Sequence, residues 1–576
     1  MNTLVIVLIA AVVLVCAYAG YGRWLAKTWG VDPNAKTPAV RLEDGKDYVP
    51  TNGWTVFAHQ FSSIAGAGPV TGAIQAAAFG WLPVLLWVLI GGVFFGAVTD
   101  FGALYASVKN DGKSMGLLIE KYIGKTGRKL FLLFCWLFCG IVIAAFADMV
   151  AGTFNAFDAD GAQVEAAFTN GSAGMVSIMF MVFAVIFGLI QKKFNFSGWK
   201  EAVVGIAFIV LSFVVGMNCP IILGKAAWSY ITFIYIFFAA VLPMWLLKQP
   251  RDYMTTFMFG AMIAGAIVGL LVAHPTMNLP VFTGINNEKL GTMFPILFVT
   301  VACGAVSGFH SLVSSGTSSK TVENEKDMLK VGYGAMVLES LLAVLALCVA
   351  GAAAAADGTP AAGTPFQIFS RGVAGFFEMF GVPVSIATVF MTMCVSALAL
   401  TSLDAVARIG RMSFQELFSV DDMEHAEGWR KLFCNVYFST FVTLAFGFLL
   451  TQIGYANIWP LFGSANQLLS ALVLATLCVF LKVTGRNNKM LFPPLVIMLC
   501  VTFTALVQRL IAMVKAISAA AATAIPAGET TWGAVFIANG LQLILAILLI
   551  VLGLNIVFHS VKGYKASEKN SEKAAV

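Results

Sequence analysis

The sequence has few charged residues and no segment polar enough to form a soluble domain. Only 11% of its 576 residues are charged, whereas a soluble domain carries roughly a quarter. Hydrophobic residues make up 59% of the chain. Apolar runs of about 20 residues, long enough to cross a bilayer, recur from end to end. The composition therefore excludes a soluble globular protein and predicts an all-α polytopic membrane protein.

Motifs for catalysis and for ATP hydrolysis are missing as well. The chain has no HExxH pair, no G-x-S-x-G elbow and no P-loop, so neither a common hydrolase nor an ATP-driven pump is indicated. Its ten cysteines lack CxxC spacing and are expected to be small buried residues. The net charge of +6 is no sign of nucleic-acid binding, because the membrane explains its placement. We therefore expect no enzyme, no cofactor and no nucleic-acid partner.

Apolar segments divide the chain into about 15 predicted transmembrane helices. The first lacks the basic start of a cleavable signal peptide, so we expect it to be retained. With the N-terminus outside, the positive-inside rule places all but five of the 35 lysines and arginines in inner loops and the tail. The exceptions are Lys225, Lys289, Arg371, Arg509 and Lys515. We thus predict an outer N-terminus, an inner C-terminus and contact with anionic membrane lipids. The predicted spans are 3–22, 54–79, 82–108, 130–153, 173–190, 200–218, 228–247, 254–273, 293–319, 331–355, 381–407, 432–452, 458–481, 491–514 and 532–558.

The stretch HQFSSIAGAGPVTGAIQ, residues 59–75, interrupts the second predicted span. Pro69 lacks an N–H and disfavours helix at the residue before it, while the neighbouring glycines can adopt irregular backbone angles. Unwound backbone survives in a bilayer only where it is buried or lines a cavity. A simple proline kink, with glycines for close helix packing, is the alternative. The predicted substrate contacts here are Ser62, Ser63, Ala65, Gly66, Gly68 and Thr71.

A second interruption lies in MFPILFVTVACGAVSGFHSLVSSGTSSK, residues 293–320. It contains several glycines, an interior histidine and many hydroxyl side chains, some of which share one helical face. The alternative is a packing seam of small residues whose hydroxyls bond to their own helix. Two such interruptions are typical of a substrate or ion path. We assign Ser307 and Ser311 to the substrate, and His310, Ser314 and Ser315 to the coupled ion.

The order of the spans predicts an internal repeat. A unit of five helices reverses the direction of its copy, so spans 2–6 and 7–11 are expected to be antiparallel. The two interrupted spans then become the first and eighth helices of a LeuT-like 5+5 inverted-repeat core, where they face each other. The two halves share no detectable sequence similarity, so the repeat rests on topology. The predicted divisions are an N-terminal helix and loop (1–53), two repeats (54–227 and 228–431), peripheral C-terminal helices (432–561) and a disordered cytoplasmic tail (562–576).

Several segments resemble the CstA carbon-starvation family. The matching pieces are HQFSSIAGAGPVTGAIQAAAFGWLP, GAVTDFGALYASVKNDGKS, GAVSGFHSLVSSGTSSK, TSLDAVARIGR and WPLFGSANQLLSAL, in family order. The resemblance implies a secondary transporter of the amino-acid/polyamine/organocation superfamily in the cytoplasmic (inner) membrane. Members are linked to uptake of peptides and to proton-coupled uptake of pyruvate. The substrate stays open, because this chain is shorter than the longest members.

Ionisable residues inside the predicted spans are candidates for ion coupling, because charges are costly in a bilayer. Asp100 can carry a proton, bind a cation or pair structurally with a basic residue. Asp404 and Arg408 lie four residues apart on one helix face, so we expect an ion pair, and Asp404 is also a coupling candidate. His310 can accept a proton near neutral pH or serve as a buried structural residue. Glu339, inside another span, is open to either role.

These features together predict a secondary active transporter whose substrate binds between spans 2, 7 and 9. The N–H groups of an unwound helix suit a small carboxylate such as pyruvate, or the C-terminus of a peptide. Proton symport follows from the resemblance, whereas oxygens of Ala65, Gly68, Ser314 and Ser315 offer a possible Na⁺ site. A starvation sensor or a membrane-embedded enzyme, each without transport, is the alternative function.

Overall fold

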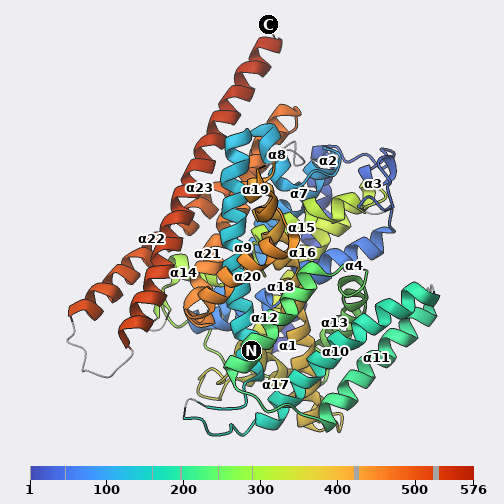
Figure 1. Ribbon diagram of the computed structural model, residues 1–576, viewed down its shortest axis with the longest axis vertical. Coiled ribbons are helices and arrows are strands. Elements are labelled where there is room, and N and C mark those ends of the chain that lie inside the picture. Colours follow the sequence, from blue (N-terminus) through green and yellow to red (C-terminus); the bar gives the residue numbers. More distant parts are fainter. Residues whose placement is uncertain are drawn as a thin grey trace.

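Helices form most of the protein, which a computed structural model describes over residues 2–45, 47–158, 160–194, 198–243, 245–287, 290–420, 427–522 and 531–575 (Figure 1). The earlier helices are α1 (Thr3–Ala17), α2 (Arg23–Trp29), α3 (Pro38–Arg41), α4 (Gly53–Ile64), α5 (Gly68–Ala76), α6 (Trp81–Gly91), α7 (Ala97–Val108), α8 (Met115–Tyr122), α9 (Lys125–Phe154), α10 (Ala167–Phe194), α11 (Trp199–Asn218), α12 (Lys225–Val241) and α13 (Lys248–Ala273). The later ones are α14 (Met293–Thr300), α15 (Gly308–Gly316), α16 (Ala335–Ala353), α17 (Pro365–Glu378), α18 (Val384–Phe418), α19 (Gly428–Phe433), α20 (Val436–Thr451), α21 (Tyr455–Val483), α22 (Phe492–Ala522) and α23 (Thr531–Ala575).

Short elements connect or interrupt these helices. The strands β1 (Asn286–Asn287) and β2 (Gly291–Thr292) pair in antiparallel register, with Asn286 opposite Thr292. The π-helical turns η1 (Tyr18–Gly22), η3 (Gly92–Gly96) and η6 (Leu329–Gly334) lie inside long helices. Single 3₁₀ turns are η2 (Ala77–Phe79), η4 (Ser318–Lys320), η5 (Glu325–Asp327) and η7 (Lys489–Leu491).

Within the described residues, eleven helices are long and apolar enough to cross a membrane. The other four predicted spans are of two kinds. Two are the shorter apolar helices α12 and α20. The remaining two are each divided, one into α4 and α5 and the other into α14 and α15. The count of about 15 crossings therefore stays a prediction, because these four segments are not single long helices.

Two elements differ from the sequence-based expectation. The amphipathic helix α17 was not predicted; a reciprocal capping box between Thr364 and Gln367 begins it. At the other end of the chain, α23 continues as a helix to Ala575, through residues expected to form a disordered tail. Its last turns are rich in lysine, glutamate and alanine, which are strong helix formers even without an apolar face.

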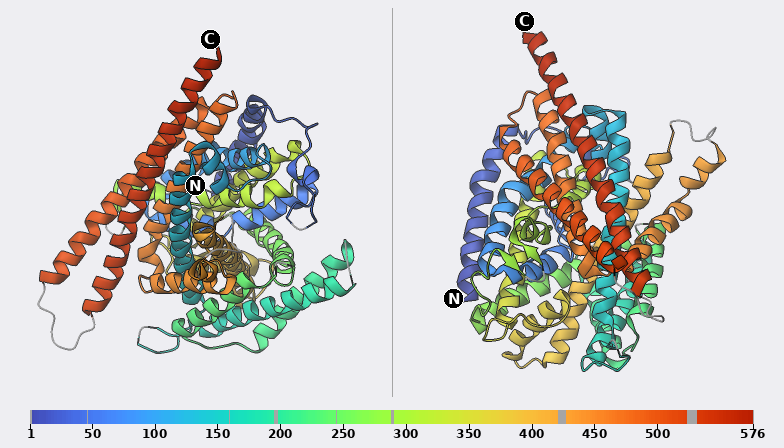
Figure 2. Two further views of the ribbon diagram at one scale, coloured as in Figure 1. Left: turned by 45° about the horizontal axis from the view of Figure 1, so that its top comes forward. Right: turned by 90° about the vertical axis from the view of Figure 1, so that its left-hand side faces the viewer.

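Burial separates central helices from peripheral ones. The most apolar window of α21 is completely buried, whereas only 22% of that of α11 is buried. The central α9 packs along α18, α20 and α21, while α22 and α23 flank one side of the molecule and α10 and α11 project from the other (Figure 2). We expected α21 among the peripheral helices. Small residues such as Gly463, Ser464 and Ala465 instead allow it to pack closely on all sides.

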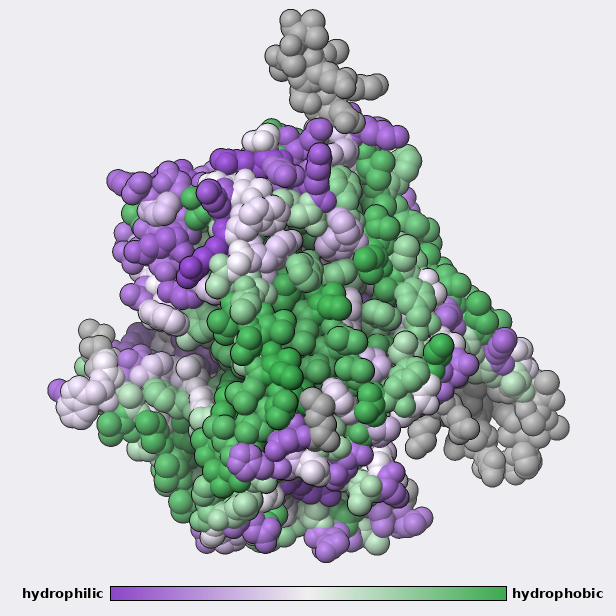
Figure 3. Space-filling model, turned by 180° about the vertical axis from the view of Figure 1, so that it is seen from behind, coloured by the Kyte–Doolittle hydropathy of each residue, from purple (hydrophilic) through white to green (hydrophobic). Residues whose placement is uncertain are grey.

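A broad hydrophobic band crosses the molecular surface between two hydrophilic ends (Figure 3). Many large apolar side chains are exposed; Val12, Phe441 and Phe558 are 63%, 64% and 65% exposed. Exposed apolar surface of this extent is costly in water and is favourable against lipid chains. The surface therefore agrees with a multi-pass membrane protein.

Candidate functional site

The predicted break in the second span is present. α4 ends at Ile64 and α5 begins at Gly68, and Ala65 between them has non-helical angles of φ −71° and ψ 59°. Gly66 and Gly68 permit close approach of two other segments. A Cβ on Gly66 would overlap Ser402 Oγ of α18, and one on Gly68 would overlap Cys303 Sγ. Glycine is required at these two positions because its lack of a Cβ lets neighbouring chains reach the unwound backbone.

The second predicted break is also present and lies against the first. α14 ends at Thr300 and α15 begins at Gly308, which leaves an irregular segment over 301–307. A Cβ on Gly72 of α5 would lie 2.6 Å from the Thr300 carbonyl oxygen. The ideal Cβ position of Gly304 is 3.6 Å from the Cα of Pro69. Two stretches of irregular backbone are therefore buried side by side, as unwound segments within a membrane must be.

A small internal cavity of about 20 Å³ adjoins both breaks. α9, α18 and α21 complete its wall. Its side-chain polar groups include Ser402 and Asn466, beside the backbone of Gly66 and Gly68, and its aromatic lining is Phe138, Phe146, Phe309 and Phe462. A space of this size holds about one water molecule. The cavity thus combines a few polar groups with an apolar wall, as binding sites for small molecules do.

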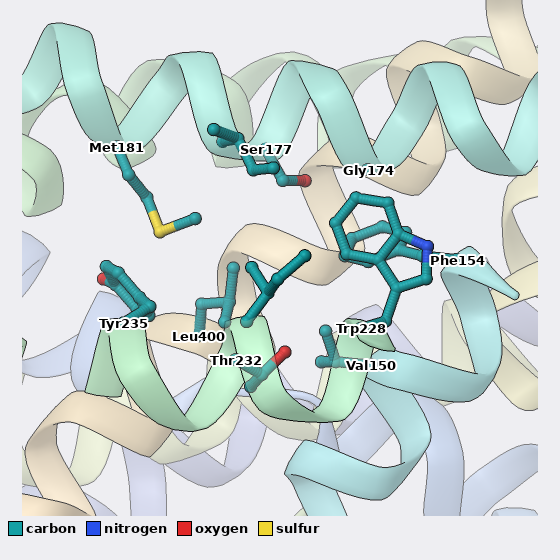
Figure 4. A pocket seen from close by; sticks show the side chains of 11 residues that line it. Val150, Phe154, Gly174, Ser177, Met181, Trp228, Thr232, Tyr235 and Leu400 are labelled. Carbon is teal, nitrogen blue, oxygen red and sulfur yellow. The ribbon is translucent and has the colours of Figure 1, made fainter. Parts of the chain in front are cut away.

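The seventh predicted span does not reach this cavity. It corresponds to α12, which instead lines a separate cavity of about 10 Å³ with α9, α10 and α18 (Figure 4). There Tyr235 of α12 lies across from Met181 of α10, and Trp228 of α12 lies across from Gly174. The expected wall of spans 2, 7 and 9 is thus built from spans 2 and 9 together with α9, α18 and α21. α12 packs against α9 and α18. That the seventh span borders the substrate stays a prediction.

Asn466 of α21 joins the cavity to the second break. Its amide nitrogen donates to Ser307 Oγ (3.0 Å) and Cys303 Sγ (3.5 Å), and its oxygen accepts from the N–H of Phe309 (3.1 Å). The contact of Ser307 with this amide was not anticipated. From sequence alone Asn466 has no assigned role, because buried amides also tie helices together. Its one distinguishing signal is a position three residues after Gly463, beside a second amide, Gln467, in a largely apolar helix.

Three fully buried ionisable side chains meet beside the breaks. Asp100 lies on α7, His310 on α15 and Glu339 on α16. His310 Nδ1 is 3.1 Å from Asp100 Oδ2, and His310 Nε2 is 3.4 Å from Glu339 Oε2. Among the described residues, Asp100 Oδ1 and both Glu339 oxygens have no hydrogen-bond partner. This acid–histidine group (Asp100, His310 and Glu339) therefore has two carboxylates for one imidazole.

The acid–histidine group adjoins the cavity through the start of α15. Phe309 lines the cavity, and the next residue, His310, carries the imidazole. Ser307 precedes the helix and hydrogen-bonds to Asn466. His310 therefore lies on the same turn that borders the cavity.

The other residues predicted around the first break are buried next to the cavity. Ser62 donates to the carbonyl of His59 (3.1 Å), and Thr71 donates to Met149 Sδ (3.4 Å). Of the substrate contacts predicted around the first break, only Gly66 and Gly68 are among the described residues that line the cavity. The residues placed outside the lining are Ser62, Ser63, Ala65 and Thr71.

The predicted serines of α15 are engaged within the protein. Ser311 donates to the Gly308 carbonyl (2.5 Å), and Ser315 donates to the Ser311 carbonyl (2.7 Å). Ser314 accepts a hydrogen bond from the side-chain amide of Gln60 on α4 (2.8 Å). The hydroxyls thus tie α15 to α4 and to its own backbone, which matches the packing alternative for this segment.

Asp404 is paired, but not with the expected residue. Arg251 of α13 and the hydroxyl of Tyr235 on α12 both donate to Asp404 Oδ2, the tyrosine at 2.9 Å. Arg408 instead donates to the carbonyls of Ala239 and Leu242 at the end of α12. The predicted Asp404–Arg408 pair is therefore wrong, because a partner on another helix reaches the carboxylate. We call Arg251, Asp404 and Tyr235 the arginine–aspartate group.

Comparison with known proteins gives clear relatives. A family model described as "Carbon starvation protein CstA" matches residues 2–359 and 352–505. The peptide transporter CstA of Escherichia coli is 31% identical over 83% of this chain and 77% of its own length, and that of Bacillus subtilis is 31% identical over 85% and 87%. The pyruvate/proton symporter BtsT of E. coli is 37% identical over 61% of this chain and 49% of its own.

Solved structures give more distant likenesses. A manganese transporter of Eremococcus coleocola aligns with a TM-score of 0.47 at 10% identity, over 91% of this chain and 99% of that one. MhsT, solved with L-phenylalanine, aligns with a TM-score of 0.47 at 13% identity, over 88% and 99%. At these scores the likeness carries no argument about the site.

Proposed function

Because the chain belongs to the carbon starvation protein CstA family, we propose that it is a secondary active transporter that imports a small carboxylate together with a proton. Its relatives are named as transporters of peptides or of pyruvate with protons. Those names favour transport over a starvation sensor or a membrane-embedded enzyme. We place the protein in the cytoplasmic membrane with its N-terminus outside, as the distribution of basic residues predicts.

The acid–histidine group is the observation that carries this proposal. Asp100, His310 and Glu339 are fully buried, and two acids compete for one imidazole. An uncompensated charge in a dry interior is very costly, so such a group is stabilised by binding protons. Buried ionisable residues within membrane helices are typical of proton relays. The group therefore supplies a site that can take up and release the coupled proton.

Protons are a better match to the site than sodium. The oxygens proposed for Na⁺ were those of Ala65, Gly68, Ser314 and Ser315. The Ser314 hydroxyl accepts from Gln60, and the Ser315 hydroxyl donates to its own helix. Sodium needs several oxygens gathered around one point, and both serine hydroxyls are engaged in hydrogen bonds within the protein.

The cavity favours a small carboxylate as substrate. The N-termini of α5 and α15 both border it, through Gly68 and Phe309, and helix N-termini carry positive dipole ends. Asn466 and Ser402 can add hydrogen bonds. Among the described lining residues none is acidic, so the ammonium group of a peptide has no countercharge there. Peptides remain the second candidate, because the relatives covered over most of their length are named peptide transporters.

Transport requires the cavity to enlarge, because about 20 Å³ is too small for pyruvate. The two broken spans provide the elements that can move, since their irregular segments are not held by continuous helical hydrogen bonds. Their side-by-side position supports the proposal of two inverted five-helix repeats, with alternating access by motion of one group of helices against the other.

The proposal is tested by uptake of labelled pyruvate into proteoliposomes with proton and sodium gradients imposed separately. We expect accumulation with an acidic exterior, none with sodium alone, and little competition from a tripeptide. Gly68→Val should abolish uptake but not membrane insertion, because its side chain would overlap Cys303 at the break. The matched control is Gly260→Val on α13, where a Cβ meets nothing within 4 Å.

Three outcomes would change the proposal. Uptake driven by a sodium gradient would show that the coupled ion is Na⁺ and not a proton. Gradient-driven entry of the tripeptide without pyruvate uptake would show that the substrate is a peptide. Normal pyruvate uptake by Gly68→Val would remove the break from the transport path.

A further inference from the structure

A basic groove lies at one end of the membrane-spanning helices, away from the transport site. It has a volume of about 800 Å³ and is formed by the α8–α9 junction, the end of α21 and the late part of α23. Lys121, Lys482, Lys562 and His559 line it. None of the described residues in its lining is acidic. The groove is therefore a local concentration of positive charge.

The groove lies at the boundary between apolar and polar surface. Lys482 is the last residue but one of α21, and Lys562 lies near the end of the apolar stretch 538–566 of α23. Lys121 lies just before the start of α9 at Lys125. Figure 3 shows hydrophilic residues gathered at the end of the molecule where the C-terminal helix emerges, next to the broad hydrophobic band.

An apolar track leads from the groove along the outside of α23. Phe558 and Leu554 precede Lys562 by four and eight residues, so the three share one helical face. Phe558 is 65% exposed and Leu554 is 53% exposed. On the adjoining end of α21, Val483 is 54% exposed. A positive rim above an exposed apolar track complements a molecule with an anionic head and hydrocarbon chains.

We propose that this groove binds the phosphate headgroup of an anionic phospholipid, whose acyl chains lie along α23. Lysines act as flexible point charges toward phosphate, and three of them surround the groove. The apolar track distinguishes a lipid from a soluble phosphate, which would gain nothing from Phe558 or Leu554. Bound lipid would hold α23 against α9 and α21, the helix that carries Asn466.

Native mass spectrometry of the full-length protein in detergent tests this inference, with phosphatidylglycerol and phosphatidylcholine as probes. We expect the wild type to prefer phosphatidylglycerol, and the exposed substitution Lys562→Gln to weaken its binding about fivefold. Lys121→Gln, Lys482→Gln and Lys562→Gln combined should weaken binding about a hundredfold and remove the preference. Size-exclusion profiles establish that each variant is folded. If the triple variant does not fold, the single variant Lys562→Gln still tests the inference.

The matched control is Lys192→Gln with Lys193→Gln, at the end of α10 on the same predicted side of the membrane. Unchanged binding in this control supports a specific groove, whereas an equal loss would reduce the effect to general surface charge and overturn the inference. Displacement of phosphatidylglycerol by glycerol phosphate at similar concentration would also overturn it, because the site would then recognise a soluble anion. These readouts do not depend on transport, so they stand or fall separately from the proposed function.

Discussion

The acid–histidine group and the arginine–aspartate group are both buried among membrane helices, yet they hold charge in different ways. In the first, Asp100 and Glu339 face His310, whose imidazole can be neutral. In the second, Asp404 faces Arg251, whose charge is permanent. The permanent charge of Arg251 leaves the first group as the one that fits the proposed proton coupling. The comparison separates a site suited to coupling from one suited to holding helices together.

Hydrogen bonding shows the same difference. Asp404 Oδ2 accepts from both Arg251 and Tyr235, which links α12, α13 and α18, while Asp404 Oδ1 has no hydrogen-bond partner among the described residues. In the acid–histidine group, both oxygens of Glu339 lack a hydrogen-bond partner among the described residues. Removing the cation of a buried ion pair is costly, whereas neutralising a carboxylate that accepts no hydrogen bond is not. Substitutions in the two groups should therefore affect different measurements.

The largest effect is expected from Arg251→Ala. It leaves Asp404 buried without its cation, which should cost about 3–5 kcal/mol of stability. Thermal unfolding in detergent and the yield of monodisperse protein measure this loss. The combination of Arg251→Met with Asp404→Leu should recover only part of it, because the buried Asp252, which lies 3.1 Å from Arg251, still loses its cation. Wild-type stability in Arg251→Ala would show that the pair does not hold these helices.

Asp100→Asn should affect coupling and leave stability nearly unchanged. Asparagine preserves the shape and can still accept from His310, but it cannot carry a proton. With a gradient of about one pH unit, one coupled proton supports at most about tenfold accumulation. The variant should lose this accumulation and keep counterflow exchange of labelled pyruvate. Unchanged acid-driven accumulation would exclude Asp100 from the coupling mechanism.

Glu339→Gln should give the same loss, and combining it with Asp100→Asn should add little. Residues that act as one unit are not additive, because losing one member already disables the unit. Glutamine replaces an acid without hydrogen-bond partners, so stability should stay within about 1 kcal/mol of wild type. A double variant much worse than either single variant would show that the two acids act independently.

The backbone features of the site could be predicted from sequence because their causes are local. Gly66, Gly68 and Pro69 favour an interrupted helix wherever they occur, and the structure confirms the break. The glycines of the second interruption likewise predicted a break in the helix, and the structure has an irregular segment over 301–307 there. Long apolar runs likewise located the eleven long helices, since length and hydropathy are read along the chain.

Contacts between helices could not be predicted in this way. Asp404 is 153 residues from Arg251, and spacing along one helix suggested only Arg408. The pairing of His310 with Glu339 and the central position of α21 were missed for the same reason. Lipid-facing and core-facing residues are both apolar in a membrane protein, so hydropathy does not show which helices are neighbours. The lateral arrangement that builds the cavity needs the three-dimensional structure.

The smallest expected effect on stability comes from Arg408, and it tests whether this arginine belongs to the arginine–aspartate group. Arg408→Gln removes its bonds to the carbonyls of Ala239 and Leu242, so we expect a loss of about 1 kcal/mol. Since both Arg251 and Tyr235 donate to Asp404 and Arg408 does not, combining Arg408→Gln with Asp404→Asn should give nearly the sum of the single losses, within about 0.5 kcal/mol. A double-mutant cycle on thermal stability measures that interaction. A coupling energy well above about 1 kcal/mol would mean that Arg408 shares the carboxylate, and the arginine–aspartate group would then have to include it.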